Sequence, residues 1–175
     1  MWFPWRVTVT VFLLDDHEIV RRGLRELLEL SGDIEVVGES GSAQEAERRI
    51  PALRPDVCVL DARLPDGSGI DVCRNIRSID PTLRSLILTS YDDEQALRAA
   101  VIAGAAGYVL KDIKGNDLVN AIRRVAVGEQ LISAEVVALI QRAEYGWAFG
   151  AAALHLGGSL FLTGLGIYTV VQLAK

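Results

Sequence analysis

Four short apolar runs of this 175-residue chain end in polar residues whose types could do chemistry together. These polar residues are Asp15, Asp16, Asp61, Thr89 and Lys111. Three carboxylates in one place repel one another unless a cation lies among them, and oxygen ligands of this kind suit Mg²⁺. A carboxylate oxygen can also attack a phosphoryl group while Mg²⁺ and a lysine neutralise charge. The set indicates a magnesium-dependent phosphoryl acceptor, provided that the fold brings its members together.

The apolar runs alternate with helical patterns, which predicts five strands, each followed by a helix. The strands are expected at 7–14, 34–37, 57–60, 86–90 and 107–110. Buried strands that alternate with helices form a parallel sheet, and this order is typical of a doubly wound α/β domain of flavodoxin-like type. Ligands of such sheets bind beyond the carboxyl ends of the strands, which is where the polar residues stand.

Local signals predict where several elements begin and end. Residues Ser42 to Glu45 have the capping-box pattern that starts a helix. Pro51 and Pro55 are expected to mark the return to the third strand, and Gly104 is expected to end the fourth helix.

Other noticeable residues are expected to have surface or packing roles. His17 is interpreted as a surface loop residue, because no second histidine lies near it in the sequence. Arg21 and Arg22 are expected on a solvated helix face. Cys58 and Cys73 have no metal-ligand spacing, so we expect reduced, buried thiols of a cytosolic protein.

Five stretches of the sequence resemble the receiver domain of two-component response regulators, in the same order and at the same spacing. They are 14–18, 20–24, 59–67, 86–91 and 104–113. The resemblance covers residues 7–128, and the sequence is most similar to the receivers of regulators that carry a LuxR-type helix-turn-helix.

The resemblance implies a role for each residue of the acidic set. Asp61 would be the phosphoacceptor, and the donor would be a phosphohistidine on a sensor histidine kinase. Mg²⁺ would be held by Asp15, Asp16, Asp61 and the backbone carbonyl of Arg63. A protein of this kind is a phosphoryl acceptor rather than a dedicated enzyme.

The resemblance also implies a switch. Thr89 would hydrogen-bond the phosphoryl group, Lys111 would pair with it, and Tyr108 would rotate inward when Thr89 moves. Phosphorylation would then change the face formed by the fourth helix, the fifth strand and the fifth helix, which in relatives controls homodimerisation.

A haloacid-dehalogenase-like phosphatase is an alternative, because it also phosphorylates an Asp at a strand end. It needs a second carboxylate two residues after the nucleophile for acid–base catalysis. That position is Arg63 in this chain, which argues against the alternative.

The chain is divided by its composition into four parts. We interpret 1–6 as an N-terminal extension, 7–128 as the receiver, 129–144 as a linker helix and 145–175 as an apolar tail. Three interpretations of the tail stay open: a transmembrane helix that tethers a cytoplasmic receiver, a frameshift remnant, or short helices packed on the receiver.

Charge bears on nucleic-acid binding. The net charge is −5 and only Lys175 is cationic beyond residue 144, so we expect no direct nucleic-acid binding by this chain. The alternative function is a DNA-binding transcriptional regulator whose helix-turn-helix is lost or lies outside this chain.

Overall fold

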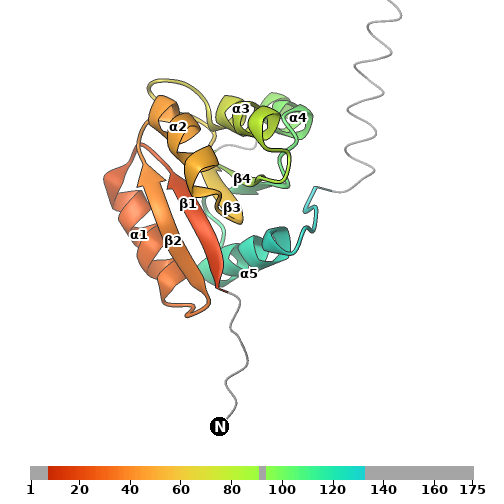
Figure 1. The fold of residues 1–175 in the computed structure, drawn as a ribbon. Coiled ribbons are helices and arrows are strands. Elements are labelled where there is room, and N and C mark those ends of the chain that lie inside the picture. The colour runs from red at the N-terminus through yellow and green to blue at the C-terminus, as the bar shows by residue number, and fades with distance from the viewer. Residues whose placement is uncertain (1–7, 91–93, 133–175) are drawn as a thin grey trace, which may run out of the picture. The chain divides into compact units, whose positions relative to one another are not determined.

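Residues 8–90 and 94–132 are described in a computed structural model, and they form a five-stranded parallel sheet with helices on both faces (Figure 1). The strands are β1 (Val9–Leu14), β2 (Ile34–Ser40), β3 (Val57–Asp61), β4 (Arg84–Thr89) and β5 (Gly107–Leu110). The helices are α1 (Glu18–Glu29), α2 (Ala43–Leu53), α3 (Gly69–Ile79), α4 (Glu94–Ile102) and α5 (Gly115–Ala126). The strand order β2-β1-β3-β4-β5 confirms the predicted flavodoxin-like fold.

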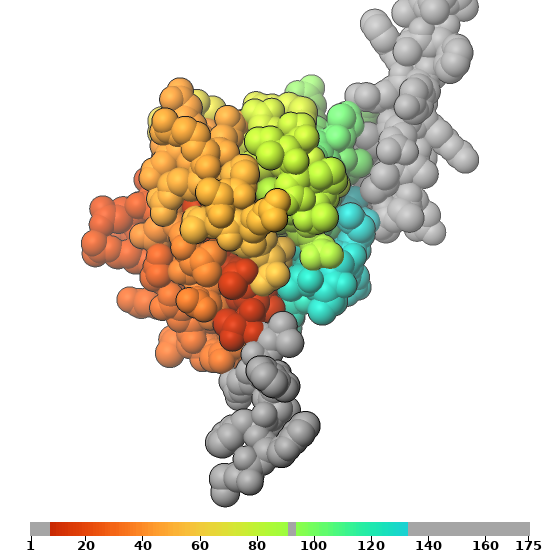
Figure 2. Space-filling view, in the orientation of Figure 1, coloured from red at the N-terminus to blue at the C-terminus, as the bar shows by residue number. Residues whose placement is uncertain are grey.

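The core consists of two apolar layers, because successive side chains of a strand point to opposite faces of the sheet. In β1, Phe12 and Leu14 pack in the layer with α2, α3 and α4, whereas Val11 and Leu13 pack in the layer with α1 and α5. Figure 2 shows α2 and α3 side by side on the face of the molecule turned to the viewer. All five residues of β3 are buried, so this central strand is held from both faces.

The predicted capping box at the start of α2 is only half formed. The Ser42 hydroxyl accepts a hydrogen bond from the Glu45 N–H at 3.3 Å. The Glu45 carboxylate does not return to the Ser42 N–H but accepts from the Ser40 hydroxyl at 2.7 Å. The Ser42 N–H donates instead to the Ser40 oxygen at 3.0 Å. The Ser40 hydroxyl thus bonds both groups, the Ser42 N–H and the Glu45 carboxylate, that would bond each other in an ordinary capping box.

Several predicted boundaries were wrong. Strand β1 begins at Val9 rather than at residue 7, and β4 spans Arg84–Thr89 rather than 86–90. Strand β2 continues to Ser40, because after a bulge Gly38 to Ser40 pair with Phe12 to Leu14 of β1. Helix α2 runs past Pro51 to Leu53, since a proline in the last turn costs few backbone hydrogen bonds. The helix ends at Arg54, whose φ of 50° is left-handed.

Other expectations were confirmed. Gly104 has a φ of 79° and follows α4, a conformation that a glycine adopts without strain. Cys58 and Cys73 are buried free thiols.

The terminal interpretations fall on other parts of the chain. The extension 1–6 and the tail 145–175, with its membrane, remnant and packing alternatives, lie outside the described residues, as does most of the linker 129–144. Within residues 8–90 and 94–132, no helix is long and apolar enough to cross a membrane.

Candidate functional site

The polar residues singled out from the sequence meet at the carboxyl ends of four strands. Asp61 is the last residue of β3 and lies opposite Leu88 of β4. Thr89 ends β4, and its carbonyl accepts the Lys111 N–H at 2.7 Å just beyond β5. Because neighbouring parallel strands end together, residues far apart in the sequence reach one edge of the sheet.

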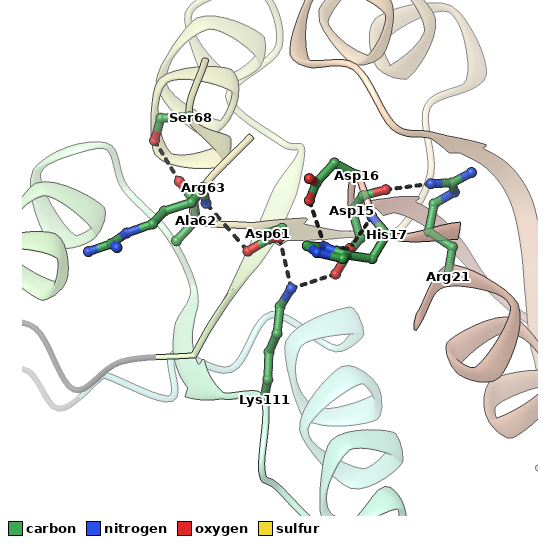
Figure 3. A network of polar contacts seen from close by, with 9 residues as sticks. All are labelled: Asp15, Asp16, His17, Arg21, Asp61, Ala62, Arg63, Ser68 and Lys111. Atoms are coloured by element: carbon green, nitrogen blue, oxygen red, sulfur yellow. Dashed lines mark hydrogen bonds and ion pairs between the residues drawn. The ribbon is translucent and has the colours of Figure 1, made fainter. Parts of the chain in front are cut away.

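Lys111 connects two of the carboxylates directly (Figure 3). Its Nζ atom donates to Asp15 Oδ2 at 2.6 Å and to Asp61 Oδ2 at 2.7 Å. Asp15 is 2% exposed and Asp61 is 6% exposed, whereas the lysine side chain is 20% exposed. The ammonium group therefore reaches from the rim of the site to two buried acids.

Among the described residues, the carboxylates of this cluster outnumber the ammonium group that bonds them. Burial raises the pKa of Asp61, although the hydrogen bond from Lys111 acts in the opposite direction and nearby Asp15 raises it further. Burial alone would lower the pKa of Lys111, but its bonds to Asp15 and Asp61 raise it overall. Three carboxylates, with Asp16, face one ammonium, which leaves two negative charges for a divalent cation to offset.

Asp16 supplies further support for a cation at this edge. Its Oδ1 atom is buried and accepts no hydrogen bond from the described part of the chain. Nδ1 of His17 lies 2.9 Å from that oxygen, and the two groups form an ion pair only when the imidazole is protonated. Ligand atoms of Asp15, Asp16, His17 and Asp61 all lie within 4.8 Å of one another. A buried carboxylate oxygen that accepts no hydrogen bond from the described residues, beside two other carboxylates, fits a hard cation such as Mg²⁺.

His17 is more closely involved than its interpretation as a surface residue suggested. The side chain is 67% exposed, as expected, but the ring also lines the cleft beside Asp61. The His17 N–H donates to Asp15 Oδ1 at 2.8 Å, which fixes the acid from the start of α1.

A cleft of about 360 Å³ opens next to the acids. Its lining includes Asp16, Asp61, Thr89 and Lys111, and the loop residues from Arg63 to Pro65 form its wall. Thr89 is 3% exposed, so only a small part of it meets the cleft. The volume is sufficient for a small anionic group beside the carboxylates.

Arg63 faces Asp61 with its backbone rather than with its side chain. The Arg63 N–H donates to Asp61 Oδ1 at 3.3 Å. The guanidinium points away from Asp61 in Figure 3, so position 63 does not supply the second carboxylate that a dehalogenase-like phosphatase uses.

Tyr108 lies on β5, half-buried against the apolar layer that contains α4. Its hydroxyl is buried and has no hydrogen-bond partner in the described part of the chain. Burying a hydroxyl without a hydrogen-bond partner costs free energy. This position of the ring is therefore weakly held, and a change nearby could shift it.

The expectation that Arg21 lies on a solvated helix face was wrong. Its guanidinium donates to the Asp15 carbonyl at 2.7 Å (Figure 3). The side chain is partly buried, and its Nη1 atom would lie 3.2 Å from a Cβ atom at Gly41. Helix α1 starts next to the loop that carries Asp15 and Asp16, so a long side chain one turn along the helix can reach back to that loop. No sequence signal distinguished Arg21 from its neighbour Arg22.

Comparison with known proteins identifies the same family that the sequence motifs resemble. The sequence profile of the response regulator receiver domain matches residues 11–123. The DNA-binding transcriptional activator DevR/DosR of Mycobacterium tuberculosis is 54% identical over 132 residues, which cover 75% of this chain and 61% of that protein. The response regulator protein VraR of Staphylococcus aureus is 34% identical over 131 residues, which cover 75% and 63%. The chain thus spans less than two thirds of the length of these curated relatives.

Solved structures agree with the sequence comparison. A LuxR-family two-component response regulator from Aurantimonas sp. SI85-9A1 superposes with a TM-score of 0.69 at 36% identity, over 79% of this chain and 99% of that one. The RcsB response regulator of Salmonella typhimurium superposes with a TM-score of 0.65 at 28% identity, over 78% and 68%. This chain belongs to the response regulator receiver family and carries the receiver domain of a two-component response regulator.

Proposed function

We propose that Asp61 is the phosphoacceptor of this receiver and that a sensor histidine kinase is its phosphodonor. The observation that supports this most directly is the position of Lys111, whose ammonium bonds both Asp15 and Asp61 at the edge of an open cleft. A structural ion pair would be closed off and neutral, whereas this cluster keeps excess negative charge beside a space for a ligand.

In the proposed reaction, this chain contributes the side chains that meet in the cleft, and the phosphohistidine of the kinase is the donor. A carboxylate oxygen of Asp61 forms a bond to phosphorus while the bond from phosphorus to the imidazole nitrogen breaks, and the departing imidazole keeps the electron pair and takes a proton from water. Lys111 Nζ, already 2.7 Å from Asp61 Oδ2, pairs with an oxygen of the arriving group. The Thr89 hydroxyl donates a hydrogen bond to another oxygen. The acceptor is thus a participant in transfer and no dedicated enzyme.

The metal proposal uses the same acids. Asp15, Asp16, Asp61 and the Arg63 backbone carbonyl would hold Mg²⁺, which supplies neutralisation of the charge on the phosphoryl oxygens. The assignment is supported by the buried Asp16 Oδ1, which accepts no hydrogen bond from the described residues, and by the carboxylate oxygens of Asp15 and Asp61 beside it.

We infer a two-state switch from the neighbouring residues. Thr89 ends β4, and Tyr108 lies on the adjacent β5 opposite Ile87. When Thr89 moves toward the phosphoryl group it leaves space near α4, and the Tyr108 ring turns into that space. The change alters the face made by α4, β5 and α5, where a second copy of the chain would bind.

The substitution Asp61→Asn tests the assignment, because an amide is not a nucleophile for phosphorus. The full chain is incubated with Mg²⁺ and either acetyl phosphate or a sensor histidine kinase that carries labelled phosphate. The phosphate incorporated into the chain is then measured. We expect complete loss in Asp61→Asn and normal incorporation in Asp56→Asn, a control with the same chemistry at a loop carboxylate outside the site. Label that persists on Asp61→Asn would contradict the proposal.

A second candidate function is transcriptional regulation through a DNA-binding part that lies outside this chain. It is favoured by the relative described as a DNA-binding transcriptional activator, of whose length this chain covers 61%. This candidate predicts that phosphorylation increases self-association of the chain while the chain alone does not shift DNA in a gel. Sedimentation with and without acetyl phosphate, beside a mobility-shift assay, tests both parts.

A further inference from the structure

One carboxylate outside the acidic cluster joins the loop after Asp61 to the start of α2. Asp66 is exposed, yet its oxygens accept hydrogen bonds from the Ser42 hydroxyl at 2.7 Å, the Ala43 N–H at 3.0 Å and the Gln44 N–H at 3.3 Å. The bonds from Ala43 and Ser42 lower the pKa of Asp66, so the group stays an anion near neutral pH.

These bonds complete the cap of α2. The first N–H groups of a helix lack partners inside the helix and carry partial positive charge. Ser42 accepts the N–H of Glu45, while Asp66 takes those of Ala43 and Gln44. The helix is therefore capped jointly by its own N-cap residue and by an acid from a separate loop.

The loop that carries Asp66 is also closed on itself. Leu64 and Gly67 exchange backbone hydrogen bonds at 3.1 and 3.3 Å. The Ser68 hydroxyl donates to the Ala62 carbonyl at 3.0 Å (Figure 3). A Cβ atom at Gly67 would lie 3.2 Å from Ala43 Cβ, which shows how closely the loop approaches α2. The start of this loop is held by the Ala62 N–H, which donates to the Leu88 carbonyl of β4 at 2.8 Å, and Asp66 attaches its far end to α2. A loop held at both ends keeps the residues between them, Arg63 among them, in place.

We propose that Asp66 is a positioning residue for the metal site. By fixing the loop against α2, it holds the Arg63 backbone beside Asp61, where the Arg63 N–H reaches Asp61 Oδ1 at 3.3 Å. The inference rests on the proposed function, because it concerns the loop whose Arg63 carbonyl would bind Mg²⁺. Removing the attachment lets the loop move, and the carbonyl is then a poorer ligand.

The test compares Mg²⁺ binding by the full chain and by Asp66→Ala, with titration calorimetry and thermal unfolding measured on the same samples. We expect the dissociation constant for Mg²⁺ to rise about tenfold in Asp66→Ala. Asp66→Asn keeps one oxygen acceptor for α2 but loses the charge, so its affinity should lie between those of Asp66→Ala and the wild type.

Asp56→Ala is the matched control. The Asp56 carboxylate also accepts a backbone N–H and a hydroxyl, both from Thr10, at 2.8 and 2.7 Å, but it precedes β3 and lies at the opposite end of that strand from Asp61. We expect this variant to lose thermal stability without a change in the Mg²⁺ dissociation constant.

Three outcomes would overturn the inference. They are an unchanged Mg²⁺ affinity in Asp66→Ala, equal losses of affinity in Asp66→Ala and Asp56→Ala, or equal losses in Asp66→Ala and Asp66→Asn, which would assign the effect to charge. A wild-type chain that binds no Mg²⁺ and accepts no phosphate would overturn the proposed function as well. Normal phosphorylation together with any of the three would overturn only the role of Asp66.

Discussion

The pKa values of carboxylates at the two ends of the sheet are shifted in opposite directions. At the amino end, Asp33 accepts bonds from Arg123 Nε at 2.8 Å and Nη2 at 2.7 Å, and a third from the Ser31 hydroxyl at 2.8 Å. The Arg123 hydrogen bonds, helped by Ser31, hold the pKa of Asp33 at about 2. At the carboxyl end, burial raises the pKa of Asp61 despite its bond to Lys111.

The difference separates a charge that stabilises from a charge that is kept ready for a ligand. Asp33 meets a full cation in bidentate geometry, so nothing further is needed to neutralise it. Asp61 shares one ammonium with Asp15 and lies near Asp16, so in the described part of the chain the acids outnumber the ammonium that pairs with them. Such an excess is tolerated because the buried strands fix the positions of the acids.

The backbone at the carboxyl end should resist change more than that of an exposed helix. A Cβ atom at Gly69 would overlap the Asp61 carbonyl oxygen, whereas one at Gly23 of α1 would meet nothing within 4 Å. We expect Gly69→Ala to lower the free energy of unfolding by about 3 kcal/mol, because backbone atoms must shift. Gly23→Ala should raise it by about 0.8 kcal/mol, the helix-propensity difference. Urea unfolding of both variants measures this, and a similar effect at both positions would contradict the packing at Gly69.

Removing the Lys111 ammonium group should reveal the repulsion between Asp15 and Asp61. Lys111→Met leaves Asp15 and Asp61 buried without a counter-ion, and we expect the free energy of unfolding to fall by about 2 kcal/mol near neutral pH. The pKa of Asp61 is already raised in the folded state, so protonation favours folding, and the variant should regain stability as the pH is lowered from neutral toward 3.8, the ordinary pKa of an Asp. Urea unfolding at neutral and at acidic pH, with and without Mg²⁺, is the measurement. A loss that is the same at both pH values would show that the ammonium does not offset these acids.

Removing the Asp33–Arg123 pair at the amino end of the sheet should lower stability less than Lys111→Met does, and its pH dependence should have the opposite sign. Asp33→Asn removes one partner of a partly exposed pair, so we expect a loss of about 0.5–1 kcal/mol at neutral pH. The folded-state pKa of Asp33 is lowered from 3.8 to about 2, so its contribution is complete above 3.8 and disappears as the pH falls through about 2. The unfolding curves of the variant and the wild type should therefore converge in acid. A constant difference down to the lowest pH would contradict the pairing seen here.

Much of the fold could be predicted because its signals are local. The strand Gly107–Leu110 and the helix end at Gly104 follow from apolar runs and glycine conformation. The fold could be predicted for the same reason, since alternating strands and helices allow few topologies. The end of β2 could not, because residues 38–40 are held by pairing with β1 and not by their own pattern.

The site divides in the same way. By itself, the sequence determined which acids stand at strand ends, since each follows its own apolar run, and so it indicated Asp15, Asp61 and Lys111 as partners. Only the tertiary structure decided that Lys111 bonds a carboxylate 96 residues away, that Arg21 turns back to the acidic loop and that Asp66 caps α2. The physical reason is that strand order and register set which loops meet, and contacts between loops leave no periodic signal in the chain.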